Sequence, residues 1–166
     1  MRLAIISDIH DQIGHLKQVL ARFEGLEPQA VLLCGDITKS EALLAARLPG
    51  LPLAFCLGNC DSGEAPRLRA TAARHGIGAW GELGEWSVGP DQLPVAFTHF
   101  PGLAVKAAAT NRYQAVFYGH THRRAHQLVD TDSGRCLLAN PGDIEGRYGR
   151  PGGLLWDSET GLLDWV

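Results

Sequence analysis

The feature that most constrains the fold is a set of short apolar runs, each followed at once by polar residues. The runs cover residues 3–6, 30–34, 53–57, 94–98 and 115–118. They lack the alternation of polar and apolar residues that marks a strand with one face in water. They therefore predict strands that are buried on both faces, as in a sheet covered by helices.

Helical periodicity separates the first three runs. Leu16, Val19, Leu20 and Phe23 recur at helical spacing, and Gly25 is a plausible end of that helix. Further helices are predicted over residues 40–47, with Ser40 as the N-cap, and over residues 65–75, ending at Gly76. Two strands joined by a helix predict a right-handed parallel crossover.

The second half of the chain is richer in strands and turns. Short strands are predicted at 77–80 and 85–88, and one helix at 103–110. Asp132-Ser133-Gly134 predicts a hairpin turn between strands at 124–129 and 135–139, and residues 140–142 predict a turn. Residues 153–156 and 162–166 predict a closing hairpin. We expect two packed sheets with helices outside, in a single domain spanning residues 1–166.

Composition narrows the class of protein. The 166 residues are 45% hydrophobic and 20% charged, which suits one globular domain. A net charge of -3 indicates no basic surface for binding nucleic acid. No apolar run is long enough to span a membrane. We therefore expect a cytoplasmic protein with no signal peptide. Three cysteines lie in apolar runs and are expected in the core, whereas Cys60 follows a strand.

Side chains that bind metals follow each of the five apolar runs. They are Asp8 and His10, then Asp36, Asn59, His99, and finally His120 and His122. In open α/β sheets, ligands bind beyond the carboxyl ends of the strands, so we expect these side chains to meet at one edge. The pair in Gly119-His120-Thr121-His122 would by itself fit solvated loop histidines equally well.

The number and type of these side chains indicate more than one ion. Two carboxylates, one amide oxygen and four imidazoles exceed what a tetrahedral zinc needs, and they suit two ions that share Asp36. Mixed nitrogen and oxygen ligands favour manganese, iron, cobalt, nickel or zinc over magnesium or calcium. Such a site carries excess positive charge and attracts an anion such as a phosphate ester.

The complete motif set resembles that of the calcineurin-like metallophosphoesterases. The matching stretches are Asp8-Ile9-His10, Gly35-Asp36, Gly58-Asn59-Cys60-Asp61, His99 and Gly119-His120-Thr121-His122. The short length and the cysteine after the asparagine resemble the small prokaryotic phosphodiesterase branch of that superfamily. The resemblance extends to about residue 142 and implies a four-layer α/β/β/α sandwich of two mixed β-sheets flanked by helices.

The resemblance also implies roles for the site residues. Asp36 would bridge two divalent transition-metal ions, with manganese expected and nickel, cobalt, iron or zinc as alternatives. A bridging water or hydroxide would be the nucleophile, with Asp36, Asn59 and His120 as the catalytic set. The first ion would be held by Asp8, His10, Asp36 and His122, and the second by Asp36, Asn59, His99 and His120.

Two positions depart from the superfamily pattern. Cys60 stands where many members have a histidine that assists the leaving group, so we expect phosphodiesters with good leaving groups to react better than alkyl phosphates. Phe100 follows His99 where glycine is usual, and Phe100-Pro101 either reshapes the substrate side of His99 or alters only the turn.

Several alternatives remain open. The expected activity is hydrolysis of a small phosphodiester, but a metal-bound scaffold, as in the retromer subunit that shares this fold, and a phosphomonoesterase or nucleotidase are alternatives. Asp61 either orients a neighbouring group or caps the following helix. Arginines near the site either contact phosphate or are solvated; they are Arg123, Arg124, Arg147 and Arg150. We expect a homodimer, with tryptophans in the core or the interface.

Overall fold

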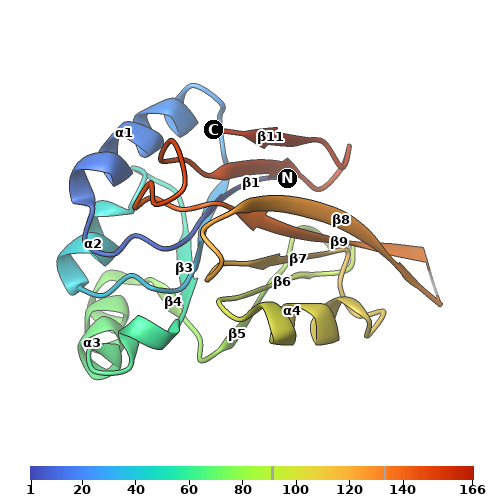
Figure 1. Ribbon diagram of the computed structural model, residues 1–166, viewed down its shortest axis with the longest axis horizontal. Coiled ribbons are helices and arrows are strands. Elements are labelled where there is room, and N and C mark those ends of the chain that lie inside the picture. The colour runs from blue at the N-terminus through green and yellow to red at the C-terminus, as the bar shows by residue number, and fades with distance from the viewer. Residues whose placement is uncertain (91, 133) are drawn as a thin grey trace.

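A computed structural model of the chain describes residues 1–90, 92–132 and 134–166. Two mixed sheets face each other, and helices cover their outer faces (Figure 1). The six-stranded sheet has the order β11-β10-β1-β2-β3-β4, and the five-stranded sheet has the order β5-β6-β7-β9-β8. This confirms the two packed sheets with helices outside that the sequence predicted, and it is the four-layer α/β/β/α arrangement that the resemblance implied.

The strands of the first sheet are β1 (Arg2–Ile6), β2 (Ala30–Cys34), β3 (Leu53–Cys56), β4 (Gly78–Ala79), β10 (Leu154–Asp157) and β11 (Leu163–Trp165). The strands of the second sheet are β5 (Leu83–Trp86), β6 (Val95–Thr98), β7 (Ala115–Tyr118), β8 (Arg124–Thr131) and β9 (Gly134–Pro141). The helices are α1 (Ile13–Glu24), α2 (Ser40–Ala45), α3 (Ala65–His75), α4 (Pro101–Ala108) and the 3-10 turn η1 (Asn59–Asp61).

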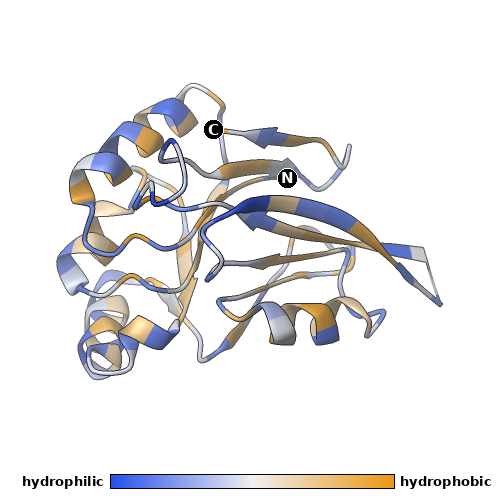
Figure 2. Ribbon diagram, viewed as in Figure 1, coloured by the Kyte–Doolittle hydropathy of each residue, from blue (hydrophilic) through white to orange (hydrophobic). Residues whose placement is uncertain are grey.

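Alternate residues of the central strands build separate apolar layers. Ile6, Leu33 and Phe55 pack with residues of α1, α2 and α3, whereas Ile5 and Leu32 pack against the second sheet. A third layer joins α4 to that second sheet. Each fully buried aliphatic side chain contributes roughly 1.5–3 kcal/mol. Figure 2 shows these hydrophobic stretches along the strands and the inner sides of the helices.

Strand direction determines where the loops meet. β1, β2 and β3 are parallel, and so are β6, β7 and β9. The loop after β1 bonds to the loop after β2, with Ile9 N donating to Asp36 O at 3.0 Å. The loop after β7 reaches the same place, where His120 N donates to Asp8 Oδ2 at 3.0 Å. Loops from both sheets therefore converge at one edge.

The predicted helix at 65–75 and the parallel pairing of the first three strands are confirmed, but local details differ. Lys39, not Ser40, is the N-cap of α2, because Ser40 already has helical geometry. Asn140 and Pro141 are not in a turn: they extend β9, where Pro141 pairs with Arg124. The hairpin of β8 and β9 is confirmed, although Ser133 of its predicted turn lies outside the described residues. In the described ranges, no helix is long and apolar enough to cross a membrane.

Gly119 lies where β7 passes the end of β1. A Cβ at this position would meet Ser7 Oγ, and it would lie 2.8 Å from both Asp8 Oδ2 and Cys34 O. Backbone atoms and a buried carboxylate cannot move aside as easily as the end of a flexible side chain. The absence of a side chain at Gly119 is therefore required for the two sheets to meet here.

We expect Gly119→Ala to lower the free energy of unfolding by about 1–3 kcal/mol, as other overpacked sites do. Gly102→Ala is the matched control, because nothing lies within 4 Å of its added Cβ in α4. Urea unfolding of both variants measures the difference. Equal stabilities would contradict the close approach at Gly119.

Candidate metal centre

Five of the seven predicted site residues have a left-handed backbone. Non-glycine residues rarely adopt positive φ, and each such residue costs about 1–3 kcal/mol and persists only where its surroundings impose that conformation. Such residues cluster at functional sites. The five are Asp8 (φ 54°), His10 (41°), Asp36 (52°), His120 (72°) and His122 (58°).

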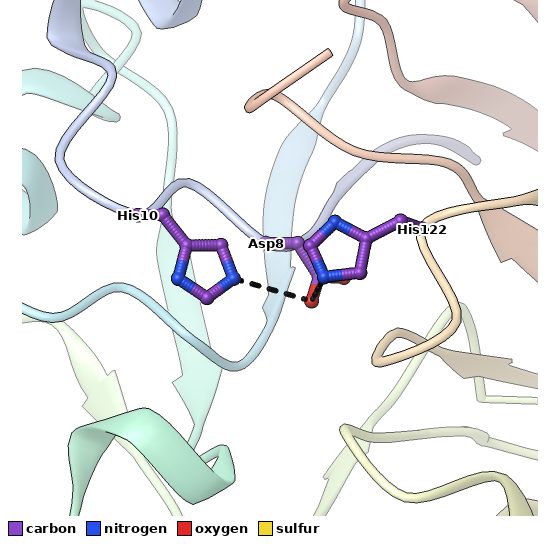
Figure 3. A group of neighbouring side chains, drawn as sticks. All are labelled: Asp8, His10 and His122. Carbon is purple, nitrogen blue, oxygen red and sulfur yellow. Dashed lines mark ion pairs between the residues drawn. The ribbon is translucent and has the colours of Figure 1, made fainter. Parts of the chain in front are cut away.

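Asp8, His10 and His122 form the first half of the site (Figure 3). His10 Nε2 lies 3.8 Å and His122 Nε2 lies 3.4 Å from Asp8 Oδ1. The two imidazole rings stack with their centroids 5.3 Å apart. Ser7 Oγ donates to the other oxygen, Asp8 Oδ2, at 2.6 Å, and fixes the orientation of this buried carboxylate.

Two ligand atoms of this half are buried without a hydrogen-bond partner. They are Asp8 Oδ1 and His10 Nε2. A buried polar atom without a partner costs about 1–3 kcal/mol, and more when the group is charged. Ligand atoms of Asp8, His10 and His122 lie within 4.8 Å of one another. This donor set fits a divalent cation, which would satisfy both unpaired atoms.

The second half contains Asn59, His99 and His120. Asn59 Oδ1 lies 2.9 Å from both His99 Nε2 and His120 Nδ1, and these two nitrogens are 3.1 Å apart. His99 is fully buried, and its Nδ1 lies 2.9 Å from Cys34 O. With a proton on that nitrogen, the lone pair of His99 Nε2 points toward the other two ligands.

Asp36 lies between the two halves. Its Oδ2 is 3.5 Å from His10 Nε2 and 3.4 Å from His99 Nε2. Its Oδ1 accepts a hydrogen bond of 2.8 Å from Cys60 N. The structure thus brings all seven predicted residues together, with Asp36 between the two groups.

Asp61 organises the loops behind Asp36. Its carboxylate accepts four backbone hydrogen bonds of 2.7–2.9 Å, from the N–H groups of Asp36, Ile37, Thr38 and Gly58. Burial, and then the charge of Asp36, raise the pKa of Asp61 despite these bonds. Asp61 therefore orients the loops after β2 and β3. The alternative that it caps α3 is wrong, because the N-cap of α3 is Glu64.

The charges of the first half are coupled. Burial would raise the pKa of Asp8, but the neighbouring imidazole of His10 and the hydroxyl of Ser7 hold it below its usual value. The same carboxylate raises the pKa of His10 against the effect of burial. Without a metal the pair favours a proton on His10, so protons compete with a cation for this half of the site.

Sequence reasoning missed Asp143, which holds His122 in place. Asp143 Oδ2 lies 2.9 Å from His122 Nδ1 and accepts a hydrogen bond of 2.8 Å from Arg147 N. A proton on His122 Nδ1 leaves the lone pair of Nε2 directed toward Asp8. The signal was present, because Asp143 follows the end of a buried strand just as Asp8 and Asp36 do.

Cys60 and Phe100 lie beside the second half. Cys60 is exposed, and Asn59 Nδ2 donates to its sulfur at 3.2 Å. Its partial burial, and then the hydrogen bond and charge of Asp36, raise the pKa of the Cys60 thiol to about 11. The Phe100 ring packs edge-on against His99, with centroids 5.3 Å apart. Phe100 therefore flanks His99 without displacing it.

Comparison with known proteins agrees with this geometry. The family profile of the calcineurin-like phosphoesterase superfamily domain matches residues 1–160, and the chain therefore belongs to that superfamily. A phosphodiesterase of Methanocaldococcus jannaschii is 28% identical over 149 residues, covering 88% of this chain and 86% of that protein. The superfamily implies divalent metal ions, and the site supplies suitable ligand groups.

Solved structures share the fold. A novel archaeal phosphodiesterase superposes with a TM-score of 0.85 at 24% identity, covering 100% of this chain and 99% of the other. The phosphoesterase Yfce of E. coli superposes with a TM-score of 0.66 at 16% identity, covering 100% and 98% of the two chains. At these identities the likeness shows the architecture alone.

We expect Asp143→Asn to weaken metal binding by about 10–100-fold, as the loss of a carboxylate behind a metal-binding histidine does. Titration of Mn²⁺ against the metal-free protein measures this. Asp130→Asn is the matched control, since that carboxylate is exposed on β8 and pairs with Arg135. Equal affinities in the two variants would show that Asp143 does not position His122.

Proposed function

We propose that this protein is a phosphodiesterase that hydrolyses small phosphodiesters at a centre of two divalent metal ions. One observation carries the proposal. Seven side chains from five loops place their ligand atoms in two groups joined by Asp36, and two of those atoms are buried without partners. The named activity of the Methanocaldococcus jannaschii relative supports a diester over a monoester as substrate.

The proposed ligand sets follow the two halves. Asp8, His10, Asp36 and His122 would hold one ion, and Asp36, Asn59, His99 and His120 would hold the other. Manganese is the proposed metal, because mixed imidazole and oxygen ligands suit it, and nickel, cobalt, iron or zinc would fit the same donors. Bound ions supply an activated water and offset the negative charge of the phosphoryl oxygens.

The residues themselves provide a fixed and open site. His99 is anchored by Cys34 O and His122 by Asp143, so both rings are oriented before any ligand arrives. Asn59 and His120 are exposed, whereas Asp8 and Asp36 are buried. Substrate would therefore approach from the side of Asn59 and His120, with the carboxylates beneath it.

The scaffold alternative has less support. A protein that uses this fold only for binding has no need to keep buried carboxylates or left-handed histidines, which cost stability. This chain has all seven proposed ligands and also the residues that orient them. Hydrolysis is the function that accounts for that cost.

We expect Asp36→Asn and His120→Ala to lower kcat/KM for bis(4-nitrophenyl) phosphate with Mn²⁺ by about 100-fold or more, because each variant removes a ligand of the centre. His126→Ala is the matched control for His120, since His126 is exposed on β8. Circular dichroism confirms that the variants are folded. Full metal-dependent activity in either site variant would refute the assignment.

Cys60 leads to a prediction about the leaving group. A thiol whose pKa is about 11 is protonated at neutral pH and is not poised as a nucleophile. We expect Cys60→Ser to keep kcat/KM for the activated diester within about threefold, since a true general acid or base contributes about 10²–10⁴-fold. We also expect the wild type to hydrolyse alkyl phosphomonoesters far more slowly. Comparable rates on both substrates would contradict this reading of Cys60.

A further inference from the structure

A cavity of about 610 Å³ opens beside the first half of the site. It lies between the turn after β7, the start of β8 and the segment that follows β9. The lining residues are His122, Arg123, Arg124, Gly142, Asp143, Tyr148, Gly149 and Arg150. The proposed ligand sets leave this cavity unused, although His122 and Asp143, which holds His122 in place, both line it.

The cavity is distinct from the position of the ions. His122 separates the two: its Nε2 lies toward Asp8, and its Nδ1 lies toward Asp143, which lines the cavity. A phosphate bound at ions that Asp8 and Asp36 would hold would therefore be on one side of this ring. A second group of the same molecule would reach the cavity on the other side.

The charge of the lining is predominantly positive. It contains three arginines and one carboxylate, and that carboxylate is already engaged by His122 and Arg147 N. Arg22 of α1 adds to this charge: burial, and then the charges of Arg150 and Arg124, lower its pKa. The surroundings therefore favour an anion.

The three arginines differ in their availability. Arg124 donates to Val166 O at 2.9 Å and lies over the Trp165 ring, so it is held by the fold. Arg123 lies 4.6 Å from the centre of the Tyr148 ring, which supports it by a cation–π contact. Neither Arg123 nor Arg150 has a carboxylate partner within the part of the chain that the structure describes.

We propose that Arg123 and Arg150 bind a second phosphate group of the substrate. This rests on the proposed function and specifies it further: the preferred substrate is a small phosphodiester that carries an additional phosphate. Guanidinium groups bind phosphate oxygens in a bidentate manner that lysine cannot match. Tyr148 holds Arg123 at the cavity in advance, which reduces the entropy lost on binding.

The test compares two ligands that differ by one phosphate. Thymidine 3′,5′-bisphosphate and thymidine 5′-monophosphate are titrated by calorimetry into the manganese-loaded protein, so that the readout does not depend on turnover. We expect the wild type to bind the bisphosphate about 10-fold more tightly, as one additional charge-assisted contact provides. Arg123→Gln and Arg150→Gln should each reduce that preference to about threefold or less.

Arg135→Gln is the matched control, because Arg135 is exposed on β9 at the end of the hairpin distant from the cavity. It should keep the wild-type preference. Affinities within twofold for the two ligands in the wild type would overturn the proposal, as would cavity variants that behave like Arg135→Gln. Hydrolysis of bis(4-nitrophenyl) phosphate is measured separately. Its absence would refute the phosphodiesterase without altering the outcome for the second phosphate.

Discussion

The structure depends on two carboxylates that are buried close together. Ligand atoms of Asp8, Asp36 and His99 lie within 4.8 Å of one another, and all three residues are almost fully buried. Burial of like charges is costly unless opposite charge and hydrogen bonds offset it. Within the described residues, the ion-pair partners of Asp8 and Asp36 are imidazoles, with no lysine or arginine among them. Divalent cations would supply the positive charge that offsets these two carboxylates.

Hydrogen bonds from neighbouring groups hold both carboxylates in place. Ser7 and His120 N bind one oxygen of Asp8, and Cys60 N binds one oxygen of Asp36. In each carboxylate the other oxygen remains directed toward the histidines. Asp61 then fixes the loop of Asp36 through backbone N–H groups. These hydrogen bonds hold the strained backbone after the strands in its left-handed conformation.

The sequence was sufficient for the architecture and for the grouping of the seven candidate site residues at one edge. Apolar runs such as 30–34 predict strands buried on both faces, as β2 is, and a glycine such as Gly76, which adopts a left-handed conformation, ends a helix at a definite residue. Residues that orient a loop or a candidate ligand, without being candidate ligands themselves, were harder to predict. The roles of Asp61 and Asp143 depend on which loops meet in space: a position after a buried strand marks Asp143 as a candidate, but it does not show that its partner is His122. Pro141 was misjudged for the same reason: as the last residue of β9 it continues pairing with β8, although Pro-Gly alone favours a turn.

The way that the site is divided between the sheets has a consequence for the integrity of the whole molecule. Asp8 follows a strand of one sheet, and His120, which is 112 residues away in the chain, follows a strand of the other. Ions held by residues of both loops would act as a reversible cross-link between the two layers. A covalent link that closes a loop of about 100 residues removes roughly 4.7 kcal/mol of chain entropy from the unfolded state in the simplest model. The bound ions would thus link the two sheets reversibly, and removing them with a chelator would loosen the packing of one sheet on the other.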